Sequence, residues 1–129
     1  LKYLPHLQVL ILADNKITDI SALAQLKELK YVELFMNRIP DVSPLVGLPD
    51  LIDINVCNTH LENIEPLKHF TQAERLWFAM NGLTSAQNKE VVEALPNVTC
   101  NYTTRDETGE GWREHERYDW IRSLFKDSN

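Results

Sequence analysis

The sequence has 129 residues, of which 43% are hydrophobic and 25% charged, and its formal net charge is −6 at pH 7. A chain of this length and composition folds as one domain, and it is neither disordered nor collagen-like. The acidic balance argues against nucleic acid as a partner, because sequence-independent binding needs a basic face, and no apolar run reaches the roughly 18 residues of a membrane span.

The dominant feature is an internal repeat of 22 residues. Its apolar columns are Leu4, Leu26, Leu48, Phe70 and Val92; Leu7, Leu29, Leu51, Ala73 and Leu95; Leu10, Val32, Ile54, Leu76 and Val98; and Leu12, Leu34, Val56, Phe78 and Cys100. We expect no insertion or deletion between Leu4 and Thr103. Such a period is typical of a solenoid, in which stacked repeats bury one continuous core.

Each repeat contains an L-x-L core that predicts a short strand with alternate residues pointing inward. A polar column follows it: Asn15, Asn37, Thr59, Asn81 and Thr103. A buried amide at this point can satisfy backbone groups that the turn leaves without partners. We therefore predict an α/β solenoid, a right-handed superhelix with a parallel concave sheet of about five strands.

The last repeat departs from the pattern. Residues Ser85 to Ala94 predict a helix with Ser85 as its N-cap, because apolar residues recur there at helical spacing. Residues 97–101 then predict the strand that closes the sheet. We expect the repeats to occupy residues 1–103, with an incomplete repeat at the N-terminus.

Residues 104–129 follow the repeats. A polar loop comes first, and an apolar stripe then predicts a short helix; the stripe consists of Tyr118, Ile121, Leu124 and Phe125. We predict that this part is a C-terminal capping loop and helix over the last repeat, because solenoids need capped ends. It is also dense in aromatic and basic side chains, namely Trp112, Arg113, His115, Arg117, Tyr118 and Trp120. We interpret them as an aromatic lid with stacked arginines, a second binding site being the alternative.

The stretches LILADNKITDISALAQL, VELFMNRIPDVSPLVGL and NIEPLKHF resemble bacterial internalins and their short 22-residue class of leucine-rich repeat. The likeness covers residues 4–103. Internalins are surface or secreted proteins that bind other proteins through the concave sheet, so the resemblance implies this fold, this kind of function and this location. The closing GWREHERYDWIRSLF looks like the C-terminal ends of some secreted leucine-rich-repeat proteins of gut Firmicutes.

Strand residues between the inward positions face the concave side of the sheet. We predict that a protein binds there through Tyr31, Glu33, Phe35, Met36, Asp53, Asn55, Arg75, Trp77, Met80 and Tyr102. Aromatic, Met and Arg side chains are typical of interface hot spots, and an exposed patch of them usually has a function. Two other interpretations stay open: these side chains pack on one another, or the C-terminal residues fold over them.

The sequence carries no catalytic, cofactor or metal motif. The histidines share neither a column nor a metal-ligand spacing: His6, His60, His69 and His115. We expect Cys57 and Cys100 to be free thiols, since two strand spacings of about 9.6 Å exceed the roughly 7 Å limit between bridged α-carbons. Cys100 is expected in the core, whereas Cys57 faces outward and is a candidate reactive thiol.

Taken together, the residues and the resemblance predict a non-enzymatic protein-binding module, without cofactor or metal, within a larger bacterial surface or secreted protein. We expect a protein partner of unspecified identity, no nucleic acid and no membrane insertion; the oligomeric state is left open. Two alternatives remain: a cytoplasmic regulatory subunit of the phosphatase-regulator type, and a structural spacer within a larger protein.

Overall fold

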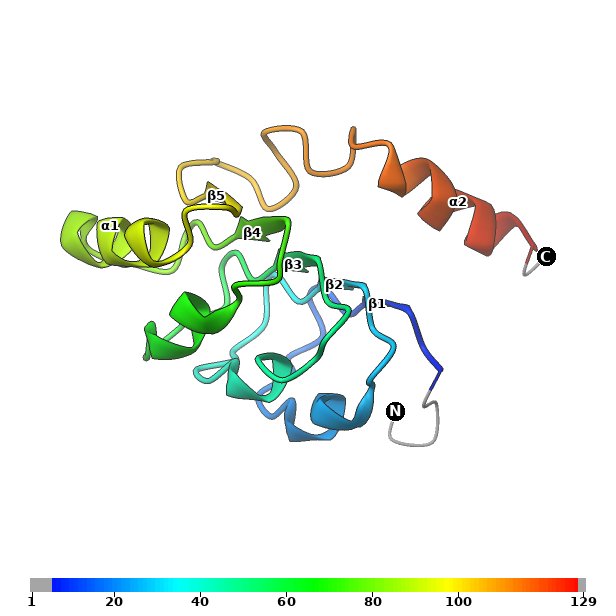
Figure 1. Ribbon diagram of the computed structural model, residues 1–129, viewed down its shortest axis with the longest axis horizontal. Coiled ribbons are helices and arrows are strands. Elements are labelled where there is room, and N and C mark those ends of the chain that lie inside the picture. Colours follow the sequence, from blue (N-terminus) through cyan, green and yellow to red (C-terminus); the bar gives the residue numbers. More distant parts are fainter. Residues whose placement is uncertain (1–5, 128–129) are drawn as a thin grey trace.

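The computed structural model describes residues 6–127, with side chains through Leu124. In this part of the chain, five three-residue strands lie parallel in one sheet, in the order of the sequence (Figure 1). They are β1 (Val9–Ile11), β2 (Tyr31–Glu33), β3 (Asp53–Asn55), β4 (Arg75–Trp77) and β5 (Thr99–Asn101). The predicted solenoid with a parallel sheet of about five strands is confirmed.

Each of the first four strands is followed by a turn and a return segment that leads to the next strand. The return segments contain the 3-10 helices η1 (Ser21–Gln25), η2 (Ser43–Leu45) and η3 (Glu65–His69), and then the α-helix α1 (Ser85–Ala94). The first three begin with an Asx turn, in which Asp19, Asp41 and Asn63 accept a hydrogen bond from the backbone N–H two residues later. A short polar side chain favours this turn because it replaces a backbone acceptor.

The hydrophobic core lies between the sheet and the return segments. The central strand side chains Val32, Ile54 and Leu76 are fully buried. They pack against return-path residues that are also buried, namely Leu23, Leu26, Leu45, Leu48, Leu67 and Phe70. Burial stabilises each such side chain by about 1.5–3 kcal/mol. Among the described residues, none after Cys100 belongs to this core, so the repeats bury it by themselves.

In the middle repeats the polar column satisfies the backbone at the turns, as predicted, whereas its end members Asn15 and Thr103 are exposed. Asn37 Oδ1 accepts hydrogen bonds from the backbone N–H groups of Asn15 and Ile17, at 2.9 and 3.0 Å. Its amide nitrogen donates to the carbonyls of Leu12 and Leu34, at 2.7 and 2.9 Å. Asn81 makes the equivalent bonds to Thr59, Leu61, Val56 and Phe78. One buried side chain thus joins two neighbouring repeats.

The step from β4 to β5 is two residues longer than the other steps. Tyr31 pairs with Asp53 and Asp53 with Arg75, but Arg75 pairs with Thr99. The expectation of a register without insertion is therefore wrong at this step. The physical reason is α1, since a ten-residue α-helix takes the place of a short 3-10 turn.

Helix α1 has the predicted range but a different N-cap. The Thr84 side chain accepts a hydrogen bond from the backbone N–H of Gln87, and the Gln87 side chain accepts one from the backbone N–H of Thr84. This capping box makes Thr84 the cap instead of Ser85. The closing strand is also shorter than the predicted 97–101.

The longer step moves Tyr102 away from the concave face. Leu76 pairs with Cys100, so the register places Tyr102 beside Phe78, and their ring centroids are 5.8 Å apart. Phe78 points into the core. Tyr102 therefore covers the end of the core beyond β5 while staying exposed, and its predicted place among the concave-face residues is wrong.

Residues 104–127, called here the C-terminal segment, do not stack on the last repeat as predicted. After β5 the chain turns back and runs along the sheet from β4 towards β1, ending in α2 (Arg117–Asp127) (Figure 1). Of the predicted stripe, Ile121 is buried and Leu124 is exposed, while the Phe125 side chain lies outside the described residues. The segment covers the concave face because its anchoring side chains find partners there.

Within residues 6–127, the helices lack either the length or the apolar character needed to cross a bilayer.

Candidate functional site

Trp112 anchors the C-terminal segment on the concave face. Its side chain is fully buried, and its ring lies 5.3 Å from that of Tyr31 and 5.0 Å from that of Trp77. Around it lies a second apolar cluster, separate from the core of the repeats. This cluster, called here the concave cluster, consists of Tyr31, Phe35, Cys57, Trp77, Ala79, Trp112 and Ile121. Aromatic pairs at such spacing add roughly 0.5–1.5 kcal/mol to the burial of area.

Glu33, on β2, is a fully buried carboxylate that the segment neutralises. Its oxygens accept hydrogen bonds from Trp112 Nε1 at 2.7 Å, from Arg113 Nη2 at 2.7 Å and from the Tyr31 hydroxyl. The hydrogen bond to Glu33 raises the pKa of Arg113. Burial raises the pKa of Tyr31, and the charge of Glu33 raises it further. A buried carboxylate needs such partners because an unpaired one loses its hydration without compensation.

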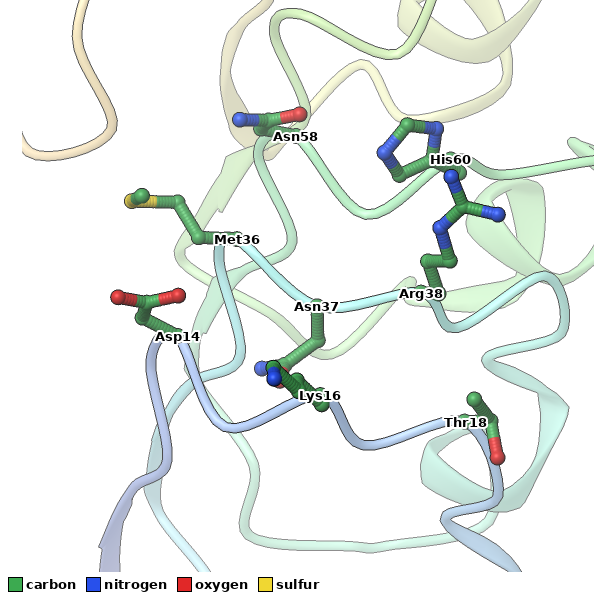
Figure 2. A pocket seen from close by; sticks show the side chains of 8 residues that line it. All are labelled: Asp14, Lys16, Thr18, Met36, Asn37, Arg38, Asn58 and His60. Atoms are coloured by element: carbon green, nitrogen blue, oxygen red, sulfur yellow. The ribbon is translucent and has the colours of Figure 1, made fainter.

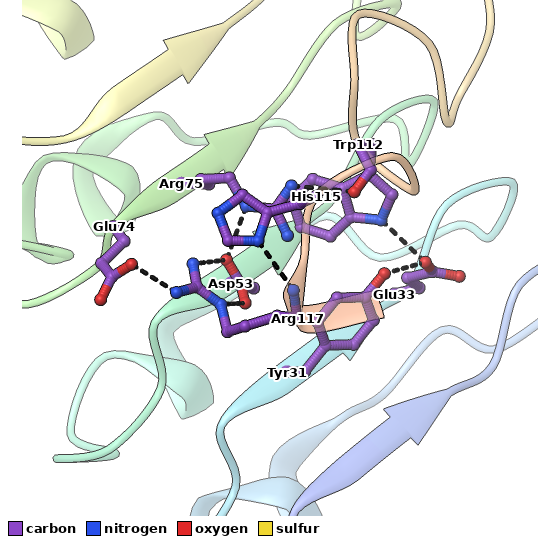
Figure 3. A network of polar contacts seen from close by, with 8 residues as sticks. All are labelled: Tyr31, Glu33, Asp53, Glu74, Arg75, Trp112, His115 and Arg117. Carbon is purple, nitrogen blue, oxygen red and sulfur yellow. Dashed lines mark hydrogen bonds and ion pairs between the residues drawn. The ribbon is translucent and has the colours of Figure 1, made fainter. Parts of the chain in front are cut away.

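Asp53, on β3, forms the second charged anchor. Arg117 holds it with two hydrogen bonds, Nε to Oδ2 at 2.6 Å and Nη2 to Oδ1 at 2.8 Å, and Arg75 Nε donates to Oδ1 at 2.7 Å (Figure 3). Arg117 Nη1 also lies 2.6 Å from a Glu74 carboxylate oxygen. These bonds, first of all the one to Asp53, raise the pKa of Arg117. Two-pronged guanidinium–carboxylate pairing fixes geometry as well as charge.

Backbone carbonyls of the segment also bind the sheet. Trp77 Nε1 donates to the carbonyl of Gly109 at 2.9 Å, and Asn55 Nδ2 donates to that of Glu107 at 2.7 Å. Arg75 Nη1 donates to the carbonyl of Trp112 at 2.8 Å, with its guanidinium 4.2 Å from the Trp112 ring centroid (Figure 3). Three side chains of the sheet thus bind carbonyls of the segment, and one buried donor of the sheet, Arg75 Nη2, is left without a partner.

Most of the predicted binding residues lie under the C-terminal segment and are buried: Tyr31, Glu33, Phe35, Asp53, Asn55, Arg75 and Trp77. The interpretation in which C-terminal residues fold over the face describes this arrangement. Trp112 and Tyr118 pack on the face, whereas Trp120 is exposed. Met36 and Met80 remain exposed, at 41% and 38%. Protein binding through the ten residues stays a prediction, and in this structure only these two methionines of the set offer a large apolar surface on the face to a partner.

Met36 borders an open cavity of about 550 Å³ at the C-terminal ends of β1, β2 and β3 (Figure 2). Its lining residues are Asp14, Lys16, Thr18, Met36, Asn37, Arg38, Asn58 and His60, and we call it the turn-side cavity. Asp14, Met36, Asn58 and Met80 occupy equivalent places in successive repeats, and all have positive φ, from 50° to 62°. Asp and Asn tolerate this conformation, whereas a Met there is strained. Exposed methionines in a strained turn are a feature that packing does not explain.

The residues that sequence reasoning missed are of two kinds. Arg113 and Arg117 were seen only as lid residues, although they are four apart and the concave columns hold two carboxylates; that complementarity was the available signal. Three residues of the turn-side cavity, Lys16, Arg38 and His60, directly follow the polar column at intervals of 22. A column of basic character in an acidic chain was the signal for that surface.

The two cysteines are free, as predicted. Cys57 lies just beyond β3 in the concave cluster and is fully buried under the segment. Burial raises its pKa to about 12, and it raises that of Cys100 to about 11. The interpretation of Cys57 as a reactive thiol is therefore wrong in this structure, because a reactive thiol has a low pKa and access to solvent. Within residues 6–127, the His, Cys, Asp and Glu side chains form no group that could hold a metal ion.

Comparison with known families and structures agrees with this architecture. The family model for leucine-rich repeats in two copies matches residues 5–45. The crystal structure of an internalin (inlF) from Listeria monocytogenes superposes with a TM-score of 0.71 and 30% identity, over 81% of this chain and 30% of that one. The chain is an internalin-like leucine-rich-repeat protein. Internalin C2 (inlC2) from the same organism has the same fold, with a TM-score of 0.65 and 23% identity over 84% of this chain and 50% of that one.

This internalin-like chain spans at most half the length of either internalin. No match is found among curated proteins. Leucine-rich-repeat domains are in general protein-interaction modules, since stacked repeats present an extended surface.

Proposed function

We propose that this chain is a non-enzymatic protein-binding module within a larger bacterial surface or secreted protein, and that its partner contacts the turn-side cavity. The observation that carries the proposal is the exposure of Met36 and Met80 on the margin of the concave face that the C-terminal segment leaves free. Met adapts to irregular partner surfaces and is enriched in interfaces. The likeness to internalins supports the bacterial surface or secreted location.

The residues around Met36 suit a protein partner. The cavity of about 550 Å³ combines an apolar side chain with Lys16, Arg38 and Asp14 at its rim. An apolar centre within a polar rim is the usual anatomy of a protein interface. The buried amide of Asn37 fixes the backbone beneath it through four hydrogen bonds. The surface is thus held in place before a partner arrives, which lowers the entropic cost of binding.

Site-specific crosslinking tests this surface. A photoreactive phenylalanine replaces Met36, Met80 or, as a control, Lys89, which is 75% exposed on α1; each variant is mixed with cell-surface proteins of the source organism and illuminated. We expect the same crosslinked protein from positions 36 and 80 and not from 89. With that protein purified, Met36→Ala should weaken binding about fivefold, or roughly 1 kcal/mol, while Lys89→Ala leaves it unchanged. Equal crosslinking from all three positions contradicts the proposal.

One observation favours a second function. The C-terminal segment fills the centre of the concave face, the surface that a binding module usually presents, so a structural spacer within a larger protein is the alternative. A spacer should give no specific crosslink from position 36 or 80.

A further inference from the structure

The concave cluster carries a feature that a purely structural cover does not require. Glu33 and Asp53 are fully buried, and the cations that neutralise them come mainly from one short stretch, Arg113 and Arg117. A cover held by apolar residues alone would be as stable as this charged one, because buried ion pairs stabilise a fold little more than apolar side chains of the same size. Charges at these positions instead select which segment binds, since only a segment with matched cations avoids leaving the carboxylates unpaired.

The repeats do not need the C-terminal segment to bury their core. That core ends at Cys100, and the contacts of the segment are with the separate concave cluster. Within residues 104–124 the segment buries only two large apolar side chains, Trp112 and Ile121. Its arginines stay partly in water, with Arg113 37% and Arg117 24% exposed. Removal of the segment should therefore open the concave face and leave the solenoid folded.

The C-terminal segment leaves one polar group of the concave face without a partner. Arg75 Nη2 lies buried at the interface without an acceptor, and a buried donor without a partner weakens the binding of the segment. A segment from another protein that placed an oxygen there would recover this binding energy. The competing segment needs this additional binding energy, because the C-terminal segment is tethered and so has an effective concentration of the order of millimolar at the site.

We propose that the concave cluster is a binding site for an extended segment of a partner protein that carries a tryptophan with arginines one and five residues after it, and that the C-terminal segment is a resident ligand which this partner displaces. The tryptophan fills the place of Trp112 between Tyr31 and Trp77. The first arginine pairs with Glu33 and the second with Asp53. This site is distinct from the turn-side cavity, so the two proposals stand or fall separately.

The test uses the full chain with its segment loosened. Gly109→Val is the first variant, since a Cβ at Gly109 would lie 2.4 Å from Thr104 Oγ1, and it changes no charge. Arg113→Gln with Arg117→Gln is the second. Arg122→Gln is the matched control, because Arg122 is 61% exposed and its guanidinium contacts Asp119 and the Tyr118 ring, both within its own helix, instead of a carboxylate of the sheet. Circular dichroism checks the fold, and alkylation of Cys57 shows that the face has opened.

The probe is a fluorescent synthetic peptide of residues 107–122, measured by anisotropy. We expect both loosened variants to bind it at least about tenfold more tightly than the wild-type chain or the Arg122→Gln control. The same peptide with Gln at positions 113 and 117 should bind at least about tenfold more weakly. A designed peptide that keeps only the tryptophan and the two arginines, in a Gly/Ser/Ala background, should compete with the probe.

Four results overturn the proposal. In the first, neither loosened variant exposes Cys57, so the segment is not displaceable. In the second, Cys57 becomes reactive but the probe does not bind. In the third, the probe binds but the designed peptide does not compete, so the tryptophan and the two arginines are not what the site recognises. In the fourth, the wild-type chain forms a dimer at high concentration by exchanging its segment, and the occupant is then a second copy of this chain instead of a partner protein.

Discussion

The repeat core is held by apolar side chains that recur at a fixed spacing, whereas the C-terminal segment is held by two charged anchors and one buried tryptophan. In the core, no single contact is special, because each repeat buries the same kind of surface against its neighbours. On the concave face, Trp112, Arg113 and Arg117 make the side-chain hydrogen bonds and ion pairs to the two buried carboxylates. This difference means that the stacked repeats form a cooperative scaffold, whereas the C-terminal segment binds to it as a ligand would and forms its cover.

The largest effect is expected from a cavity in the repeat core. Leu48→Ala should lower the free energy of unfolding by about 3–5 kcal/mol, because Leu48 is fully buried among rigidly stacked repeats. Urea denaturation followed by circular dichroism measures it. Leu124→Ala, at a side chain 40% exposed on α2, is the control and should cost less than about 1 kcal/mol. Similar losses for both variants would mean that the cover is part of the cooperative core.

A somewhat smaller effect is expected from the polar column. Asn37→Ala should cost about 2–3 kcal/mol, since it leaves buried backbone groups of Asn15, Ile17, Leu12 and Leu34 without partners. Asn15 occupies the equivalent place in the first repeat but is exposed, so Asn15→Ala should cost less than about 1 kcal/mol. Thermal unfolding of the two variants under the same conditions checks the contrast. Equal costs would show that the buried hydrogen bonds of Asn37 stabilise the chain no more than those of the exposed Asn15.

How far these regions could be predicted follows from the same comparison. The core could be predicted from the sequence because the same apolar positions recur in every repeat. Leu26 and Leu48, for example, lie 22 residues apart in one column. The extra two residues before Thr99 were missed because Val98 and Cys100 are both apolar and both point inward, so either register satisfies the pattern. The apolar pattern therefore could not distinguish the two registers of β5. The length of α1 determines which one forms.

The path of the C-terminal segment was harder to predict because its anchors are distant in sequence and do not repeat. Glu33 and Arg113 are joined by a contact between one strand and one loop residue, and a single sequence offers no second instance of it. The aromatic and charged residues of the concave columns were correctly identified as unusual. Their partner is a segment of the same chain. Strand alternation shows which side chains face away from the core, but it does not show whether the same chain or another protein covers them.

High pH should destabilise the folded chain through Tyr31 of the concave cluster. Burial and the charge of Glu33 raise the pKa of Tyr31 in the folded chain. A group with a raised pKa stabilises fully below its unfolded value, here about 10, and that stabilisation is lost as the pH rises above it. Between pH 9 and 11 we expect the free energy of unfolding to fall by about 1 kcal/mol more in the wild type than in Tyr31→Phe. Identical pH dependence of the two proteins would show that Tyr31 is not shielded.

The smallest effect concerns local opening of the cover, and Cys57 reports it. In the closed structure this thiol is fully buried and its pKa is raised to about 12, so iodoacetamide at pH 8 should label it far more slowly than Cys100, which is only half-buried on β5. Salt at 1 M, with a Debye length of about 3 Å, screens the partly exposed Arg113 and Arg117. Labelling of Cys57 should then accelerate about two- to tenfold while the free energy of unfolding stays nearly constant, because the apolar core does not respond to screening. If labelling and global unfolding instead change in parallel, the segment opens only when the repeats unfold, and the distinction between scaffold and cover disappears.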